Sequence, residues 1–176
     1  LRHARNRFEL PEGLIYLDGN SLGPLPSGVR ERVAAVVAAE WGSDLITSWN
    51  VHDWIGMPAR VGAKVARLVG APEGSVVAGD STSVQLFKLL VAASRLRPGR
   101  NVIVTEPGNF PTDTYITTSV ARMLGLQVRW CDPADVAASL DADVAVLSLT
   151  HVDYRTGRMH DARAVTAAAH EAGALT

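Results

Sequence analysis

The stretch Asn101-Val102-Ile103-Val104-Thr105 opens the part of the sequence that decides the fold. It has the pattern of a short buried strand, residues 111–124 follow with helical spacing, and residues 127–131 form a second strand pattern. Pro111 fixes the turn into this helix and Gly125 ends it. A strand, a helix and a strand in this order form a βαβ unit, which favours a parallel sheet.

The same alternation continues on both sides of this unit. Further strands are expected at 75–79 and 144–149. Helices are expected at 26–41, 58–70, 82–93, 161–172 and, with Asp132 as N-cap and Pro133 at the first helical position, from residue 133. The sequence therefore predicts an α/β fold with a mostly parallel sheet flanked by helices. Residues 174–176 have the pattern of a further strand at its beginning, so we expect the sequence to be part of a longer chain.

Composition limits the possible functions. The 176 residues are 47% hydrophobic and 20% charged, with a formal net charge of -1, which gives no bulk attraction to nucleic acid or to an anionic membrane. A single cysteine, Cys131, excludes an internal disulfide framework and fits a reducing compartment. Lys64 and Lys88 are the only lysines. We therefore expect a protein of the cytoplasm that binds neither nucleic acid nor membrane.

A polar turn near the N-terminus is the first candidate site. It reads Leu17-Asp18-Gly19-Asn20-Ser21-Leu22-Gly23-Pro24 and can extend neither a helix nor a central strand. Such a turn offers backbone N–H groups, an amide and a hydroxyl to a ligand. The alternative is a surface turn before the next helix.

Three strand-to-helix junctions are the other candidates. Residues 79–83 place hydroxyls and free N–H groups at a helix N-terminus, where the helix dipole favours phosphate, although a plain capping sequence explains them as well. In residues 106–113, Phe110 stands where its ring can cover a flat cofactor, or can pack into the core. In residues 150–157, His151 and Asp153 lack the spacing of a third metal ligand, so no metal site is expected.

Five motifs occur in this sequence in the order in which they occur in kynureninases. They are Leu17 to Pro24, Trp49-Asn50 with His52 to Gly56, Asp80 to Val84, Phe110 to Asp113, and Thr150-His151-Val152 with Tyr154 to Gly157. The sequence resembles this family, and most closely its bacterial members, over essentially its whole length. The resemblance implies the aspartate aminotransferase-like fold (fold type I) of pyridoxal-phosphate (PLP) enzymes, with this sequence as the N-terminal portion only.

The resemblance also implies roles for individual residues. Thr82 and Ser83 match the positions that bind the cofactor phosphate, and Phe110 matches the residue that stacks on its ring. The residues expected to bind PLP are Thr82, Ser83, Phe110, Pro111, Thr112, Asp113 and Thr150. Those expected to bind the substrate are Asn20, Ser21 and His52. Tyr154 and Arg155 either shape the same cleft or are structural.

The implied reaction is hydrolysis of L-kynurenine, and of 3-hydroxykynurenine, to anthranilate or 3-hydroxyanthranilate and L-alanine, in tryptophan catabolism and the kynurenine pathway that leads to NAD biosynthesis. The Schiff-base lysine of the family is expected beyond Thr176, because neither Lys64 nor Lys88 matches it. No catalytic residue is therefore assigned, and the 176 residues alone are expected to be inactive.

Two alternatives stay open. One is another fold type I PLP enzyme, such as a cysteine desulfurase or a class V aminotransferase. The other is a non-catalytic truncated fragment. The resemblance further implies a homodimer, a first segment (residues 1–50) that contributes to the small domain and the active-site loops, and a second (residues 51–176) that forms the first part of the PLP-binding large domain.

Overall fold

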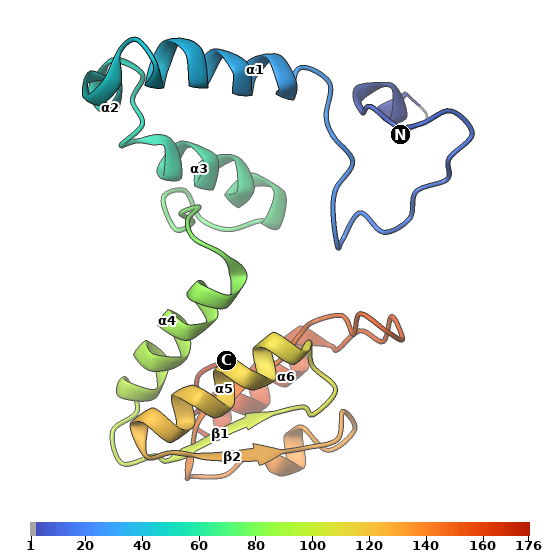
Figure 1. Ribbon diagram of the computed structural model, residues 1–176. Coiled ribbons are helices and arrows are strands. Elements are labelled where there is room, and N and C mark those ends of the chain that lie inside the picture. Colours follow the sequence, from blue (N-terminus) through green and yellow to red (C-terminus); the bar gives the residue numbers. More distant parts are fainter. Residues whose placement is uncertain (1–2) are drawn as a thin grey trace. The chain divides into compact units, whose positions relative to one another are not determined.

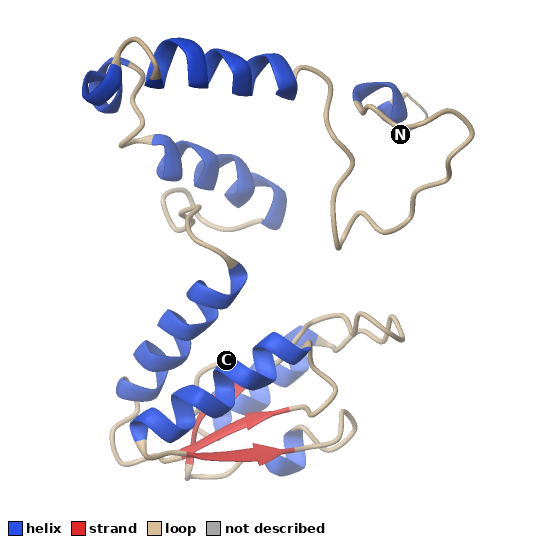
Figure 2. Cartoon of the chain, viewed as in Figure 1, coloured by secondary structure: helices blue, strands red, loops and turns tan. Residues whose placement is uncertain are grey.

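The computed structural model describes residues 3–176. They form two compact units, an N-terminal unit that ends at Ala78 and a C-terminal unit from Gly79 to Thr176 (Figures 1 and 2). The boundary expected at residue 50 concerns the domains of a longer protein and stays a prediction.

The named elements of the N-terminal unit, among the residues that the structure describes, are helices. After the 3₁₀-helical η1 (Ala4–Arg7) and the polar turn, its elements are α1 (Val29–Ala35), the π-helical η2 (Val36–Trp41), η3 (Leu45–Thr47), α2 (Ser48–Val51) and α3 (Met57–Val69). The helix expected at 26–41 therefore begins later and changes to π-helical geometry at Val36. Gly28 precedes it with a φ of 83°, a left-handed conformation that suits glycine.

A buried glutamate joins neighbouring helical segments of this unit. Glu40 is 5% exposed; its side chain accepts hydrogen bonds from Arg32 and from Trp54 Nε1, the latter at 2.6 Å, and its carbonyl oxygen accepts one from Ser48. The hydrogen bonds from Arg32 and Trp54 hold the pKa of Glu40 below its ordinary value. The segment that carries Trp54 and His52 is thereby attached to the end of η2.

The strand expected at 75–79 does not form. Instead, Ala78 donates its N–H to the carbonyl oxygen of Pro58 at 3.1 Å, and the backbone at Val76 passes so close to Gly62 of α3 that a Cβ at Gly62 would overlap the Val76 carbonyl group. An extended apolar segment packed on a helix has the same sequence pattern as a buried strand, so the pattern led to the wrong structure here.

The C-terminal unit is a parallel sheet between two layers of helix. The strands β1 (Val102–Thr105), β2 (Gln127–Trp130) and β3 (Val144–Ser148) lie in the order β2-β1-β3, and β1 pairs with both neighbours in parallel. Leu175 continues the sheet in parallel beside β3 through hydrogen bonds with Ala145 and Leu147. The α/β class predicted from the sequence is therefore confirmed.

Each face of the sheet has its own apolar core. On one face, α4 (Thr82–Arg95) and α5 (Pro111–Leu124) pack with Leu90 and Val120 against Ile103 (Figure 1). On the other, α6 (Ala162–Glu171) and η4 (Ala137–Ser139) cover Val102, Val104 and their neighbours. Cys131 belongs to this second core, where burial raises the pKa of its thiol.

The helix predicted to begin at residue 133 is wrong. Asp132 and Pro133 lie in a turn, and the first helical residues after β2 are the three of η4. Two other helix predictions are confirmed: α5 has the expected bounds with Gly125 as a left-handed cap, and the helix expected at 161–172 is α6. Asp161 caps α6 by accepting the N–H of Ala164 at 3.0 Å.

Candidate cofactor and substrate site

Two of the three predicted cofactor-binding segments lie at one edge of the sheet. The three strands are parallel, so their carboxyl ends share an edge, which is where α/β proteins bind ligands. Phe110 lies in the connection that follows β1, and Thr150 lies two residues after β3. Six residues (96–101) separate the end of helix α4 from the start of β1, so the third segment, Thr82 and Ser83, lies at the end of this helix that is far from the amino end of β1.

The N-terminus of α4 has the free N–H groups and hydroxyls expected of an anion site. Ser81 is the N-cap, and its Oγ accepts the N–H of Val84 at 3.3 Å, while the N–H groups of Thr82 and Ser83 belong to the first turn and have no helical acceptor. Asp80 has a φ of 47°, unusual for a residue other than glycine, and forms an ion pair with Lys88. This pairing offsets the negative charge that would otherwise stand beside a bound phosphate.

The second group of predicted cofactor-binding residues lies at the start of α5. Phe110 is the N-cap residue, Pro111 occupies the first turn, and the N–H of Asp113 donates to the Phe110 carbonyl oxygen at 2.9 Å. Burial raises the pKa of the Asp113 carboxyl group. The Phe110 side chain is 51% exposed, so part of its ring is open to a ligand. Thr112 and Thr150 are half-buried.

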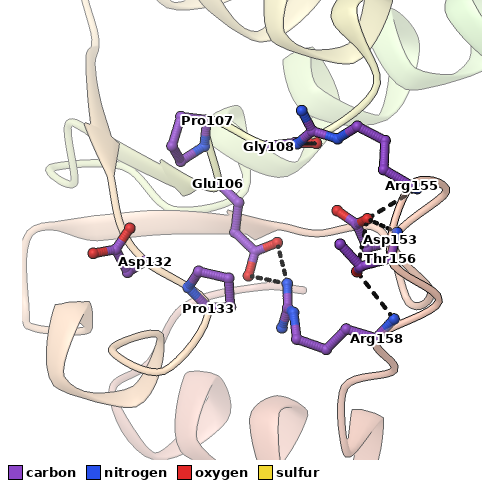
Figure 3. A pocket seen from close by; sticks show the side chains of 9 residues that line it. All are labelled: Glu106, Pro107, Gly108, Asp132, Pro133, Asp153, Arg155, Thr156 and Arg158. Carbon is purple, nitrogen blue, oxygen red and sulfur yellow. Dashed lines mark hydrogen bonds and ion pairs between the residues drawn. The ribbon is translucent and has the colours of Figure 1, made fainter.

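A buried ion cluster next to these residues was not singled out from the sequence. Glu106 directly follows β1 and is 3% exposed. Its carboxylate lies 3.1 Å from Arg158 Nη2 (Figure 3). It also lies 2.9 Å from His160 Nε2. A charged residue at the end of an apolar strand is the sequence signal, but its partners lie more than fifty residues away.

A pocket of about 450 Å³ lies beside this cluster. Its lining comes from the loops after all three strands and consists of Glu106, Pro107, Gly108, Asp132, Pro133, Asp153, Arg155, Thr156 and Arg158 (Figure 3). Phe110, Thr82 and the other predicted cofactor-binding residues do not line it. Of its charged groups, Glu106 and Arg158 form an ion pair, and Asp153 accepts hydrogen bonds from the N–H groups of Arg155 and Thr156. The cofactor site expected at the helix N-termini therefore lies outside this pocket and stays a prediction.

The predicted substrate-binding residues lie in the N-terminal unit. Asn20 and Ser21 are exposed in a turn that is closed by hydrogen bonds from the N–H of Ser21 to Asp18 O at 3.1 Å and from Tyr16 Oη to Leu22 O at 2.6 Å. His52 is half-buried, with Nε2 at 2.7 Å from Asp44 Oδ2. No hydrogen bond among the described residues joins His52 to this turn. Their roles stay predictions.

Two kinds of site are absent from residues 3–176. No three His, Cys, Asp or Glu side chains there are grouped so that they could hold a metal ion. No helix in this range has the length and apolar character needed to cross a membrane.

Curated proteins similar to this chain are kynureninases. The Pseudomonas fluorescens enzyme is 51% identical over 182 residues, which cover 99% of this chain and 44% of the relative. The Deinococcus radiodurans enzyme is 50% identical, over 100% of this chain and 44% of the relative. One from Burkholderia pseudomallei is 47% identical, over 99% of this chain and 44% of the relative. The chain thus spans less than half the length of the curated relatives it matches. No family model matches it.

Solved structures with the same fold are those of cysteine desulfurase-like proteins. The apo structure of a cysteine desulfurase from Thermococcus onnurineus superposes with a TM-score of 0.74 at 19% identity, over 98% of this chain and 45% of that one. A NifS-like protein superposes with a TM-score of 0.66 at 16% identity, over 90% of this chain and 46% of that one. At such identities the likeness concerns the fold alone.

Proposed function

The chain is a relative of the kynureninases along its whole length, and from that premise we propose that the protein it belongs to hydrolyses L-kynurenine, and its 3-hydroxy derivative, to anthranilate or 3-hydroxyanthranilate and L-alanine. The observation that carries the proposal is the identity of about half of all residues to the kynureninases named above. One water is consumed, and the bond between the β- and γ-carbons of the substrate is cleaved.

The predicted cofactor-binding residues fit PLP. Thr82 and Ser83 offer two hydroxyl groups and two N–H groups at the start of a 14-residue helix, a donor set suited to a phosphate dianion. Phe110 offers an exposed aromatic ring. When bound, PLP supplies an electron sink that stabilises carbanions. Pro111, Thr112, Asp113 and Thr150 complete the predicted contacts.

The substrate would be bound by the polar turn and by His52. The amide of Asn20 and the hydroxyl of Ser21 can both donate hydrogen bonds to a carbonyl oxygen or a carboxylate. Asp44 orients the imidazole of His52 by occupying its Nε2, so that Nδ1 is the nitrogen left to meet a substrate.

The catalytic lysine is not among these residues. Lys88 is paired with Asp80, and Lys64 lies within α3. The 176 residues alone are therefore expected to be inactive. A homodimer in the cytoplasm, where the free thiol of Cys131 stays reduced, completes the proposal.

A cysteine desulfurase is the second candidate, because solved structures of that class share the fold. Cys131 is 6% exposed and burial raises the pKa of its thiol, both of which disfavour a role as nucleophile. The two candidates differ in substrate: a desulfurase acts on L-cysteine, whose sulfur is released as sulfide when a thiol reductant is supplied, and a kynureninase releases fluorescent anthranilate from L-kynurenine.

The test is anthranilate release by the full-length protein in the presence of L-kynurenine and PLP. Release that stops when PLP is removed supports the proposal. A folded, PLP-loaded protein that releases no anthranilate, or that instead releases sulfide from L-cysteine in the presence of a thiol reductant, overturns it.

Phosphate binding can be tested separately by titration with PLP. Because hydrogen bonds to charged groups contribute about 1.5–3 kcal/mol, Thr82→Ala and Ser83→Ala should each weaken PLP binding about 10-fold or more. Ser119→Ala, an exposed position on α5, is the matched control and should leave the affinity unchanged. Equal affinities of all three variants would contradict the assignment of the phosphate to the start of α4.

A further inference from the structure

A tight hairpin follows β3 at the edge of the sheet where Phe110 and Thr150 lie. Val152 and Met159 form an antiparallel bridge, and the N–H of Asp153 donates to Arg158 O at 2.8 Å. Gly157 allows the turn with a φ of 71°. Asp153 Oδ1 accepts hydrogen bonds from the N–H groups of Arg155 and Thr156 and from the Thr156 hydroxyl, all at 2.8–2.9 Å. The conformation of this hairpin is therefore fixed by its own hydrogen bonds.

The hairpin makes three contacts with the connection between β1 and α5 (residues 106–110). Near its start, Arg158 and His160 bind the buried Glu106 carboxylate. In the middle, Arg155 Nη2 donates to the Gly108 carbonyl oxygen at 3.0 Å (Figure 3). The connection that ends at Phe110 is thus attached to the hairpin through its backbone as well as through a side chain.

The third contact reaches Phe110 itself. The rings of Phe110 and Tyr154 meet edge to face, with centroids 5.3 Å apart and planes at 70°. Arg155 Cζ lies 5.5 Å from the centroid of the Tyr154 ring, within the range of a cation–π contact. Arg155 therefore holds both the Gly108 carbonyl group and the ring that touches Phe110.

We propose that Tyr154 and Arg155 are positioning residues that set the orientation of the Phe110 ring and so strengthen its stacking on the cofactor. Phe110 is half exposed, so the contact with Tyr154 leaves part of the ring open to a flat ligand. Without Tyr154, the ring would lose this contact and would have to be ordered when the ligand binds. The inference rests on the proposed function, because it requires that Phe110 stack on PLP.

The experiment compares Tyr154→Ala, Tyr154→Phe and Tyr115→Ala in the full-length protein. The readouts are the dissociation constant of PLP and the visible circular dichroism of bound PLP, with the melting temperature as a check of folding. Tyr154→Ala should weaken PLP binding about 3- to 10-fold, the effect of losing one aromatic pair, and should change the dichroism. Tyr154→Phe keeps the ring and should behave as the unsubstituted protein does. Tyr115 is 70% exposed on α5 and serves as the control.

Arg155→Met is the second variant if Tyr154→Ala fails to fold. It removes the hydrogen bond to Gly108 and the cation–π contact, and it should weaken PLP binding in the same direction. A folded Tyr154→Ala or Arg155→Met protein with unchanged PLP affinity and dichroism would overturn this inference alone. Failure of the unsubstituted protein to bind PLP would overturn the proposed function, and this inference with it.

Discussion

Replacement of Glu106 by alanine should destabilise the C-terminal unit by about 2–4 kcal/mol. Removal of one partner from a buried ion pair costs about 3–5 kcal/mol, because the remaining charge stays buried without compensation. His160 is 7% exposed and cannot recover its lost contact from water, whereas Arg158 is 36% exposed and can do so in part. The partial recovery by Arg158 lowers the expected loss to the stated range.

Urea unfolding of the full-length protein measures this loss as a shift of the transition that reports on the C-terminal unit. Glu106→Gln keeps the shape and one acceptor oxygen, so its loss should be smaller, about 1–2 kcal/mol. Glu171→Ala removes a carboxylate from the exposed end of α6 and is the control. If Glu106→Ala lost no more stability than Glu171→Ala, the ion cluster would not stabilise the fold, and the reasoning would be refuted.

Three further predictions concern stability. Gly62→Ala should cost about 1–3 kcal/mol in urea unfolding, because its Cβ would overlap the Val76 carbonyl group, whereas Gly23→Ala meets no atom within 4 Å and should be neutral; equal losses would contradict this. Burial raises the pKa of Asp113, so the folded state binds its proton more tightly than the unfolded chain, and the stability that this proton contributes is lost as the pH rises above about 3.9 and through the folded pKa. The excess stability of Asp113→Asn over the parent should therefore grow between pH 4 and pH 7, and a constant difference would count against the burial of this carboxyl group. Ser81→Ala should lose about 1 kcal/mol in urea unfolding, because it removes the cap of α4, and an unchanged unfolding midpoint would argue against that cap.

The sequence predicts elements well where local chemistry defines both ends. Helix α5 begins at Pro111 and ends before Gly125, as expected, because a proline and a left-handed glycine act within one turn of the chain. The strand predicted at 75–79 is wrong because a short apolar run does not reveal which part of the chain it packs against. Ala78 pairs with the backbone of Pro58, not with a strand.

The candidate site shows the same limit. The capping pattern around Ser81 locates the helix N-terminus that holds Thr82 and Ser83, since a cap is a local signal. The contacts of Phe110 with Tyr154 and of Glu106 with Arg158 join residues more than forty positions apart. Periodicity and spacing carry no information about such pairs, so only the fold could reveal them.

The buried thiol of Cys131 can report how often the native state opens locally. It is the only cysteine of the 176 residues, it is packed between the sheet and η4, and its S–H reaches the Thr105 carbonyl oxygen at 3.7 Å. A thiol reagent can reach this sulfur only when β2 and the turn after it move apart from the core. The rate of thiol labelling under native conditions therefore measures how often this side of the sheet opens, without any engineered substitution.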